Sequence, residues 1–117
     1  MTRVITFEDT DEGHKRFQLV WDGFRLGTIS QKPEDRTPDR MRLEGGIRKA
    51  LKGISTNGTV EGDVDHRDLQ TGGGSVELEQ PQIKLLTQYG WAVQWRPHVV
   101  EDAIDALDYV DAAPEKS

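Results

Sequence analysis

The residues most able to do chemistry form a short cluster of three carboxylates and one histidine: Asp63, Asp65, His66 and Asp68. Hard cations do collect carboxylates from single loops. A calcium loop that began at Asp63 would need an oxygen ligand at position 67, a glycine at 68 and a glutamate at 74, but the chain has Arg67, Asp68 and Gly74. We therefore expect a solvated acidic loop that holds neither a metal nor any other cofactor.

Signatures of other enzyme classes are missing from the sequence. The histidines at positions 14, 66 and 98 are too scattered to form the metal-binding pair that a zinc hydrolase places on one helical face. The serines lack the glycine-flanked turn of a nucleophile elbow. No cysteine is present to act as a nucleophile, bind zinc or form a disulfide. We predict that the chain is not an enzyme, and a small metal-dependent enzyme built on positions 63–68 is kept as an alternative.

Charge is distributed unevenly along the chain. Fifteen basic and 21 acidic side chains leave a net charge of −6, which disfavours nonspecific attraction to nucleic acid. Positions 36–52 nevertheless hold six basic residues against two acidic ones, and a basic patch is predicted at Arg40, Arg48, Lys49 and Lys52. This segment lacks the interleaved aromatic residues that stack on bases, so direct nucleic-acid binding is not expected.

The segment 99–111 is the best candidate for contact with a partner, because it holds five acidic residues and no basic one. Glu101, Asp105 and Asp108 are predicted to meet a basic surface, since complementary charge sets the register and the on-rate of association. That surface is expected on another protein or on the basic helix of a second copy. The alternative is that the acidic side chains only keep the chain soluble.

Two tryptophans near this segment are predicted to anchor the contact if they are exposed. Trp91 and Trp95 would each add a large contact area at a small cost in side-chain entropy. The chain is poor in apolar residues, with a mean hydropathy of −0.69, so burial of both tryptophans in the core is the competing interpretation.

The first third of the chain is predicted to form strands. A β-branched run at 3–7 suggests one strand, and alternating apolar residues at 17–21 suggest another. Asp22-Gly23 then favours a two-residue hairpin turn, because both positions of that turn require a positive φ. The segment 30–37 is expected to be a linker.

The rest of the chain predicts helices and one more strand. Thr37 and Pro38 form a helix start, and apolar residues at helical spacing follow up to Ile54, with a kink or a later start at Gly45-Gly46. A strand is expected around 76–79, followed by a helix from Pro81 that ends at Gly90. A last helix is expected to start at Pro97, with a stripe of Val100, Ala103, Ile104, Leu107 and Val110.

These elements predict a single α+β domain over residues 1–117, with an N-terminal antiparallel sheet that contains the hairpin and about three α-helices packed on it. The glycine-rich segment 55–74 is expected to be mobile, because it has few apolar anchors. No apolar run approaches the length of a membrane span, and no signal peptide is evident. No membrane partner is expected, and we expect the protein in the cytoplasm of a bacterial host cell or in a virion.

The stretch from Gly72 to Pro114, with its strand, short helix, Trp-Arg-Pro bend and Asp-rich last helix, resembles small proteins encoded by tailed bacteriophages and prophages. The resemblance implies a protein that acts by contact in virion assembly or in the host. We therefore predict a non-catalytic protein–protein interaction module, a homo-oligomer or part of a larger assembly. The alternative from another class is an anti-defence inhibitor that presents its acidic surface to a nucleic-acid-binding protein.

Overall fold

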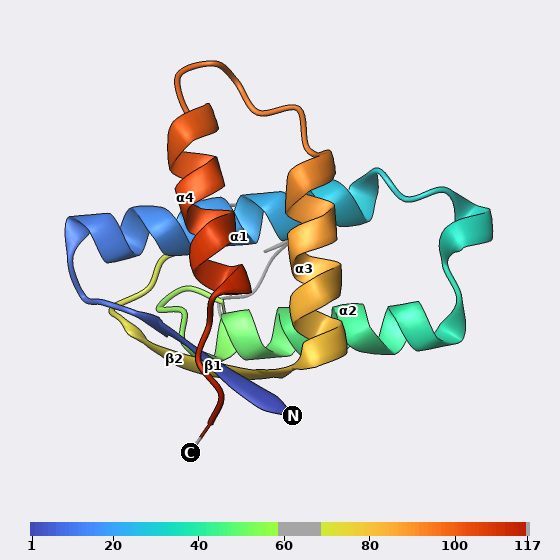
Figure 1. Cartoon of the computed structure of the whole chain (residues 1–117), viewed down its shortest axis with the longest axis horizontal. Coiled ribbons are helices and arrows are strands. Elements are labelled where there is room, and N and C mark those ends of the chain that lie inside the picture. The colour runs from blue at the N-terminus through green and yellow to red at the C-terminus, as the bar shows by residue number, and fades with distance from the viewer. Residues whose placement is uncertain (59–68, 117) are drawn as a thin grey trace.

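The computed structural model describes residues 1–58 and 69–116. In that part of the chain the elements are β1 (Thr2–Phe7), α1 (Asp11–Ile29), the 3₁₀ helix η1 (Pro33–Asp35), α2 (Pro38–Gly53), β2 (Gly74–Glu79), α3 (Gln80–Ala92) and α4 (Val100–Asp111). Helix α3 packs against α1, α2 and α4, and the two strands lie along one side (Figure 1). The predicted α+β class is confirmed.

The sheet consists of β1 and β2, which pair antiparallel although they are far apart in the sequence. Ile5 lies opposite Val76 in the register, and both side chains are buried. Phe7 and Leu78 are buried on the same face, so alternate residues of each strand point into the core. The predicted N-terminal antiparallel sheet is therefore present, but β2 supplies its second strand.

The predicted hairpin around Asp22-Gly23 is wrong, because residues 17–28 belong to α1. Thr10 caps this helix by accepting a hydrogen bond from the Gly13 N–H at 3.1 Å. Four large buried side chains of α1 are spaced three, one and three residues apart: Phe17, Val20, Trp21 and Phe24. This spacing is the period of a helix, whereas the prediction followed the alternation at 17, 19 and 21.

Gly23 serves close packing and does not form a turn. A Cβ atom at Gly23 would lie 3.2 Å from the Cα of Gly90 in α3. At Gly27, one turn further on, a Cβ would lie 2.5 Å from the Cβ of Tyr89. The two glycines let the backbones of α1 and α3 approach each other, which explains the Asp-Gly pair without a hairpin.

Helix α2 begins where the sequence predicts and runs through Gly45-Gly46 as one helix. Thr37 accepts a hydrogen bond from the Arg40 N–H at 3.2 Å, and Pro38 occupies the first turn. The predicted linker before it contains η1. Gly46 faces α3, where a Cβ would lie 2.3 Å from Nε2 of Gln82, while a Cβ at Gly45 would meet nothing within 4 Å.

The two C-terminal helices differ from the prediction at their ends. Glu79 and Gln82 form a capping box at the start of α3, but the helix continues through Gly90 to Ala92. Gly90 is needed for packing, because a Cβ there would lie 2.3 Å from Cδ2 of Leu107. Helix α4 begins at Val100 and not at Pro97, and its buried stripe contains Ala106 in place of the predicted Ile104.

The predicted mobile segment 55–74 is described only at its two ends, and positions 59–68 lie outside the described residues. Ser55 and Thr71 form an isolated antiparallel bridge that joins these ends. Gly73 has a φ of +93°, which favours glycine, and a Cβ there would lie 3.0 Å from the backbone N of Asp9.

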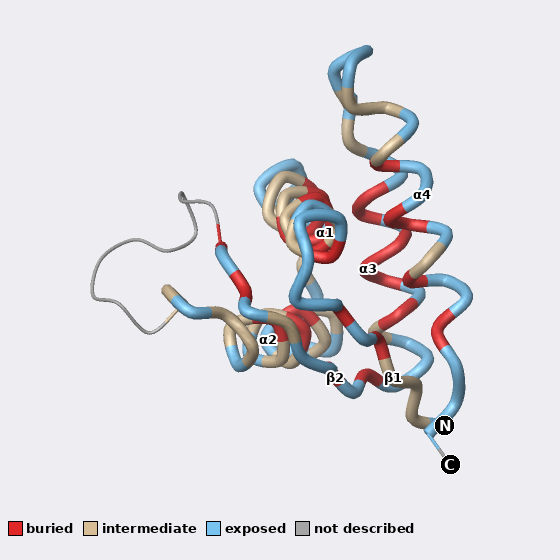
Figure 2. Tube along the Cα trace, turned by 90° about the vertical axis from the view of Figure 1, so that its left-hand side faces the viewer, coloured by how far each residue is buried: buried red, intermediate tan, exposed pale blue. Residues whose placement is uncertain are grey.

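The core lies where α1, α2, α3, α4 and the sheet meet, and the buried side of each helix faces it (Figure 2). Phe7 and Phe17 pack edge to face with ring centroids 5.2 Å apart. The chain end is tied to the sheet, because Pro114 O accepts a hydrogen bond from the Val4 N–H at 2.9 Å. The core therefore holds α3 and α4 beside each other, and this arrangement positions the candidate site.

Candidate interaction surfaces

The three predicted acidic contact residues share the solvent side of α4. Glu101, Asp105 and Asp108 are all exposed, and at 100° per residue they lie within an arc of about 60° on the helix. Asp102 lies toward α1 instead, where its carboxylate is 2.6 Å from Nζ of Lys15. Within residues 1–58 and 69–116, the carboxylates of Glu101, Asp105 and Asp108 form neither an ion pair nor a hydrogen bond. This side of α4 therefore presents three carboxylates to solvent.

Two exposed apolar side chains flank the contact between α3 and α4. Gly90 and Leu107 meet where these helices pack. Trp91 directly follows Gly90 and is 50% exposed, and Ile104 lies one turn before Leu107 and is 39% exposed. Figure 1 shows the two helices side by side. We call Trp91, Glu101, Ile104, Asp105 and Asp108 the α3–α4 face.

The second predicted tryptophan is placed differently. Trp95 is half-buried against the core, and its indole N–H donates to the Gly90 carbonyl at 3.0 Å. Its ring also approaches Gly23, where a Cβ would lie 3.3 Å from Cζ2 of Trp95. Trp95 therefore holds the connection between α3 and α4 against α1, and it is Trp91 that the fold leaves accessible to a partner.

The predicted basic patch divides between the fold and the surface. Arg40 donates to Oε1 of Gln31 at 2.7 Å, and its guanidinium lies 5.9 Å from the ring centroid of Tyr89. Arg48 lies 5.7 Å from the ring centroid of Phe24. Both arginines contact aromatic rings of the core. Lys49 is exposed, and within the described parts of the chain its ammonium group has no ion-pair partner.

A hollow of about 420 Å³ lies on the outer side of α2. It is lined by Gly45, Arg48, Lys49, Lys52, Gly53 and Gly58, and we call these residues the α2 hollow. Among the described residues, a Cβ atom at Gly45 or at Gly53 would meet nothing within 4 Å. The hollow therefore combines exposed helix backbone with three basic side chains.

Sequence reasoning missed a buried polar network between α2 and α3. Glu44 is only 2% exposed, and it accepts hydrogen bonds from the Tyr89 hydroxyl at 2.5 Å and from Nη2 of Arg36 at 3.0 Å. Burial, together with the hydrogen bond to Glu44, raises the pKa of Tyr89 above its ordinary value. One signal was present in the sequence, because Glu44 lies three residues before Ile47 and seven before Leu51 on the apolar stripe.

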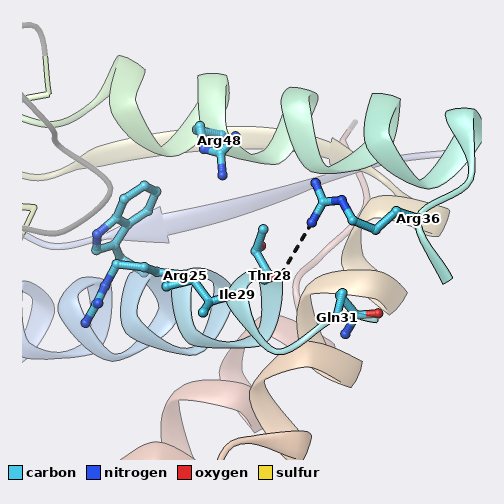
Figure 3. A pocket seen from close by; sticks show the side chains of 7 residues that line it. Arg25, Thr28, Ile29, Gln31, Arg36 and Arg48 are labelled. Carbon is cyan, nitrogen blue, oxygen red and sulfur yellow. Dashed lines mark hydrogen bonds between the residues drawn. The ribbon is translucent and has the colours of Figure 1, made fainter. Parts of the chain in front are cut away.

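A second cavity, of about 290 Å³, lies between α1 and α2 (Figure 3). Its lining includes Trp21, Arg25, Arg36 and Arg48, so its surroundings favour an anion. Two of these arginines already have acidic partners. Arg36 pairs with Glu44, and Nη2 of Arg25 is 3.4 Å from Oδ1 of Asp22. The cavity is therefore largely neutralised by the protein itself, which makes it a weaker candidate than the α3–α4 face.

The alternative of a metal-dependent enzyme depends on residues that the structure does not describe. Positions 63–68, with the acidic cluster and His66, lie outside them. In residues 1–58 and 69–116, no three His, Asp or Glu side chains are grouped closely enough to hold a metal ion. His14 lies 2.8 Å from the Asp9 carboxylate on the surface, and His98 is exposed in the connection between α3 and α4.

Comparison of the chain with protein-family models, with curated proteins and with solved structures finds no match. In the described part of the chain, the helices are too short or too polar to cross a lipid bilayer.

Proposed function

We propose that this chain is a non-catalytic protein–protein interaction module that binds a basic partner surface through its α3–α4 face. The observation that carries the proposal is the combination of Trp91 and Ile104, both exposed, with three carboxylates that have no partner in the described residues. A small apolar centre with a charged rim is the usual anatomy of a protein interface. Tryptophan is also among the residues that contribute most to binding energy.

The acidic face is not explained by the stability of α4. Asp108 and Asp111 lie in the last turn of the helix, which contains no basic residue. Carboxylates at that end face the negative pole of the helix dipole, and each destabilises the helix by a few tenths of a kcal/mol. The Asp residues are therefore better explained by a contact with a positively charged surface.

The resemblance of Gly72 to Pro114 to tailed-phage proteins supports a role in virion assembly, in which the module joins subunits of a larger structure. These three carboxylates, Glu101, Asp105 and Asp108, together with Asp111 also favour a second candidate function. An inhibitor that imitates the charge of a nucleic-acid backbone would present such a row of acids to a nucleic-acid-binding protein.

Photocrosslinking in a bacterial host that produces phage particles tests the proposal. A photoreactive benzoylphenylalanine replaces Asp108 on the α3–α4 face, and the control carries the same group at Glu34, an exposed position in η1. We expect adducts with a structural protein of the particle or with a second copy from position 108 and not from position 34. The variant Asp105→Lys should lose them.

Two results would count against the proposal in different ways. Adducts from position 108 to a nucleic-acid-binding host protein alone would favour the inhibitor over the assembly role. Equal crosslinking from positions 108 and 34 would show that the α3–α4 face has no special affinity for a partner.

A further inference from the structure

We infer that the partner of the α3–α4 face is the α2 hollow of a second copy of this chain, an inference that rests on the proposed function. The two surfaces are complementary in charge. The α3–α4 face presents Glu101, Asp105 and Asp108, and the hollow presents the exposed ammonium group of Lys49. Arg48 and Lys52 add positive charge beside it, although both also interact within their own chain. Complementary potentials steer two surfaces together and set their register.

The two surfaces are also complementary in shape. The α3–α4 face carries two protruding apolar side chains, Trp91 and Ile104. The α2 hollow has a floor of helix backbone, because Gly45 and Gly53 have no side chain there. The aliphatic stems of Lys49 and Lys52 add apolar surface beside that floor. A tryptophan side chain can therefore approach the backbone of α2 closely and keep its flanking acids near the ammonium groups.

In residues 1–58 and 69–116, no contact explains the glycine at position 45. Glycine in the middle of a helix is unfavourable, and a Cβ at this position would meet nothing within 4 Å. The neighbouring Gly46 differs, because a side chain there would collide with Gln82. An approaching surface from a second copy supplies the missing reason for a glycine at position 45.

One chain cannot bring its own two surfaces together. Figure 2 shows α2 and α4 apart, and each of them packs on α3. Asp102 of α4 pairs with Lys15 of α1, whereas in α2 Arg42 pairs with Asp39 and Glu44 pairs with Arg36. The contact is therefore between copies. Because it joins two different patches, it leaves one of each free at the ends and adds copies head to tail.

Complementation between two blocked variants tests the inference with the purified chain. Asp105→Lys with Asp108→Lys reverses the charge of the acidic face, and Lys49→Glu places a negative charge at the exposed position of the hollow. The control, Glu8→Lys with Glu34→Lys, changes the net charge as much as the first variant at exposed positions outside both surfaces. Sedimentation velocity measures mass against concentration at low salt, where charge interactions are least screened.

We expect the mass of the native chain and of the control to rise with concentration. Each blocked variant should show an apparent dissociation constant at least about tenfold higher. An equimolar mixture of the two blocked variants should form a 1:1 dimer and nothing larger, because only one intact pair of surfaces remains. Gly45→Tyr, which fills the hollow without a change in charge, should also block association.

Three results would overturn the inference. The native chain stays monomeric up to millimolar concentration, the two blocked variants fail to pair although circular dichroism shows both folded, or Gly45→Tyr associates as the native chain does. If the chain is monomeric while position 108 still crosslinks to another protein, the self-association fails and the proposed function stands.

Discussion

The replacement Tyr89→Phe should destabilise the protein through the buried network that joins α2 to α3. The substitution removes one hydroxyl and keeps the ring, which packs against Phe24 with centroids 6.3 Å apart. Glu44 then loses the donor at 2.5 Å and keeps only Arg36, at 3.0 Å. Because Glu44 is almost fully buried, water cannot replace the lost hydroxyl.

The magnitude follows from the charge of the acceptor. A hydrogen bond to a charged group contributes about 1.5–3 kcal/mol. The entropy of unfolding is about 2.1 cal/mol/K per residue, so for 117 residues each kcal/mol of lost stability lowers the Tm by about 4 °C. Thermal unfolding of Tyr89→Phe followed by circular dichroism should therefore show a Tm about 6–12 °C lower than that of the native chain.

The matched control is Tyr109→Phe. Its hydroxyl donates to the Thr6 carbonyl at an exposed site, so its loss should cost no more than about 1 kcal/mol. Glu44→Gln keeps an oxygen that accepts from Tyr89 and removes the charge that faces Arg36. Because Arg36 is about one-third exposed, Glu44→Gln should destabilise the protein by less than the loss of one partner from a fully buried ion pair, which costs about 3–5 kcal/mol. Equal Tm values for Tyr89→Phe and Tyr109→Phe would refute this account of the network.

Three further predictions concern packing, pH and the surface. Gly90→Ala should destabilise the protein by about 1–3 kcal/mol, because the new methyl group would lie 2.3 Å from Leu107. Gly45→Ala should stabilise the protein by about 1 kcal/mol. Urea unfolding measures both changes, and similar effects at the two glycines would contradict the packing described. Folding raises the pKa of Tyr89, so the contribution of the Tyr89 hydroxyl to stability is complete below the unfolded pKa of about 10 and is lost as pH rises above it. Above that pH the Tm of the native chain should therefore fall faster than the Tm of Tyr89→Phe. Curves of Tm against pH that run parallel for the two proteins would contradict this prediction. In the same urea assay, Trp91→Ala should change the free energy of unfolding by no more than about 0.5 kcal/mol, whereas Trp95→Ala should lower it by more than about 1 kcal/mol. The reverse order would show that Trp91 belongs to the core.

Helices with local start signals could be predicted from the sequence. Thr37-Pro38 and Pro81 act on the residues beside them, and α2 and α3 begin at those signals. The antiparallel sheet and a strand around 76–79 were also predicted, but the pairing of that strand with β1 was not. A capping residue, a proline and a β-branched run carry their physical reason within a few residues, so a single sequence reveals them.

Features that depend on distant neighbours were missed. Asp22-Gly23 has the local chemistry of a turn, but the glycine is required by Gly90 in another helix. Thr10, followed by two acidic residues and buried side chains at helical spacing, was the available evidence for α1. The partner of Glu44 is Tyr89, 45 residues away, and no local pattern indicates that contact.

The candidate site was predicted in part. The acidic side of α4 could be read from helical periodicity alone, since Glu101, Asp105 and Asp108 share one side of any helix in this segment. Which tryptophan reaches the surface depends on how α3 packs against α4 and α1, and so does the position of Ile104. The α2 hollow exists because Gly45 and Gly53 have no side chains on that side of the helix. In a helix prediction from sequence, such glycines only indicate lower helix stability.

Nuclear magnetic resonance of the native chain over a dilution series is the most direct measurement of contact through the α3–α4 face. As concentration rises from micromolar to millimolar, we expect the indole N–H of Trp91 and the amides of Ile104, Asp105, Gly45 and Lys49 to shift. The indole of Trp95, which is hydrogen-bonded to Gly90, should stay fixed. Shifts confined to the arginine-lined cavity between α1 and α2, or a spectrum that does not change with concentration, would contradict contact between the α3–α4 face and the α2 hollow of a second copy.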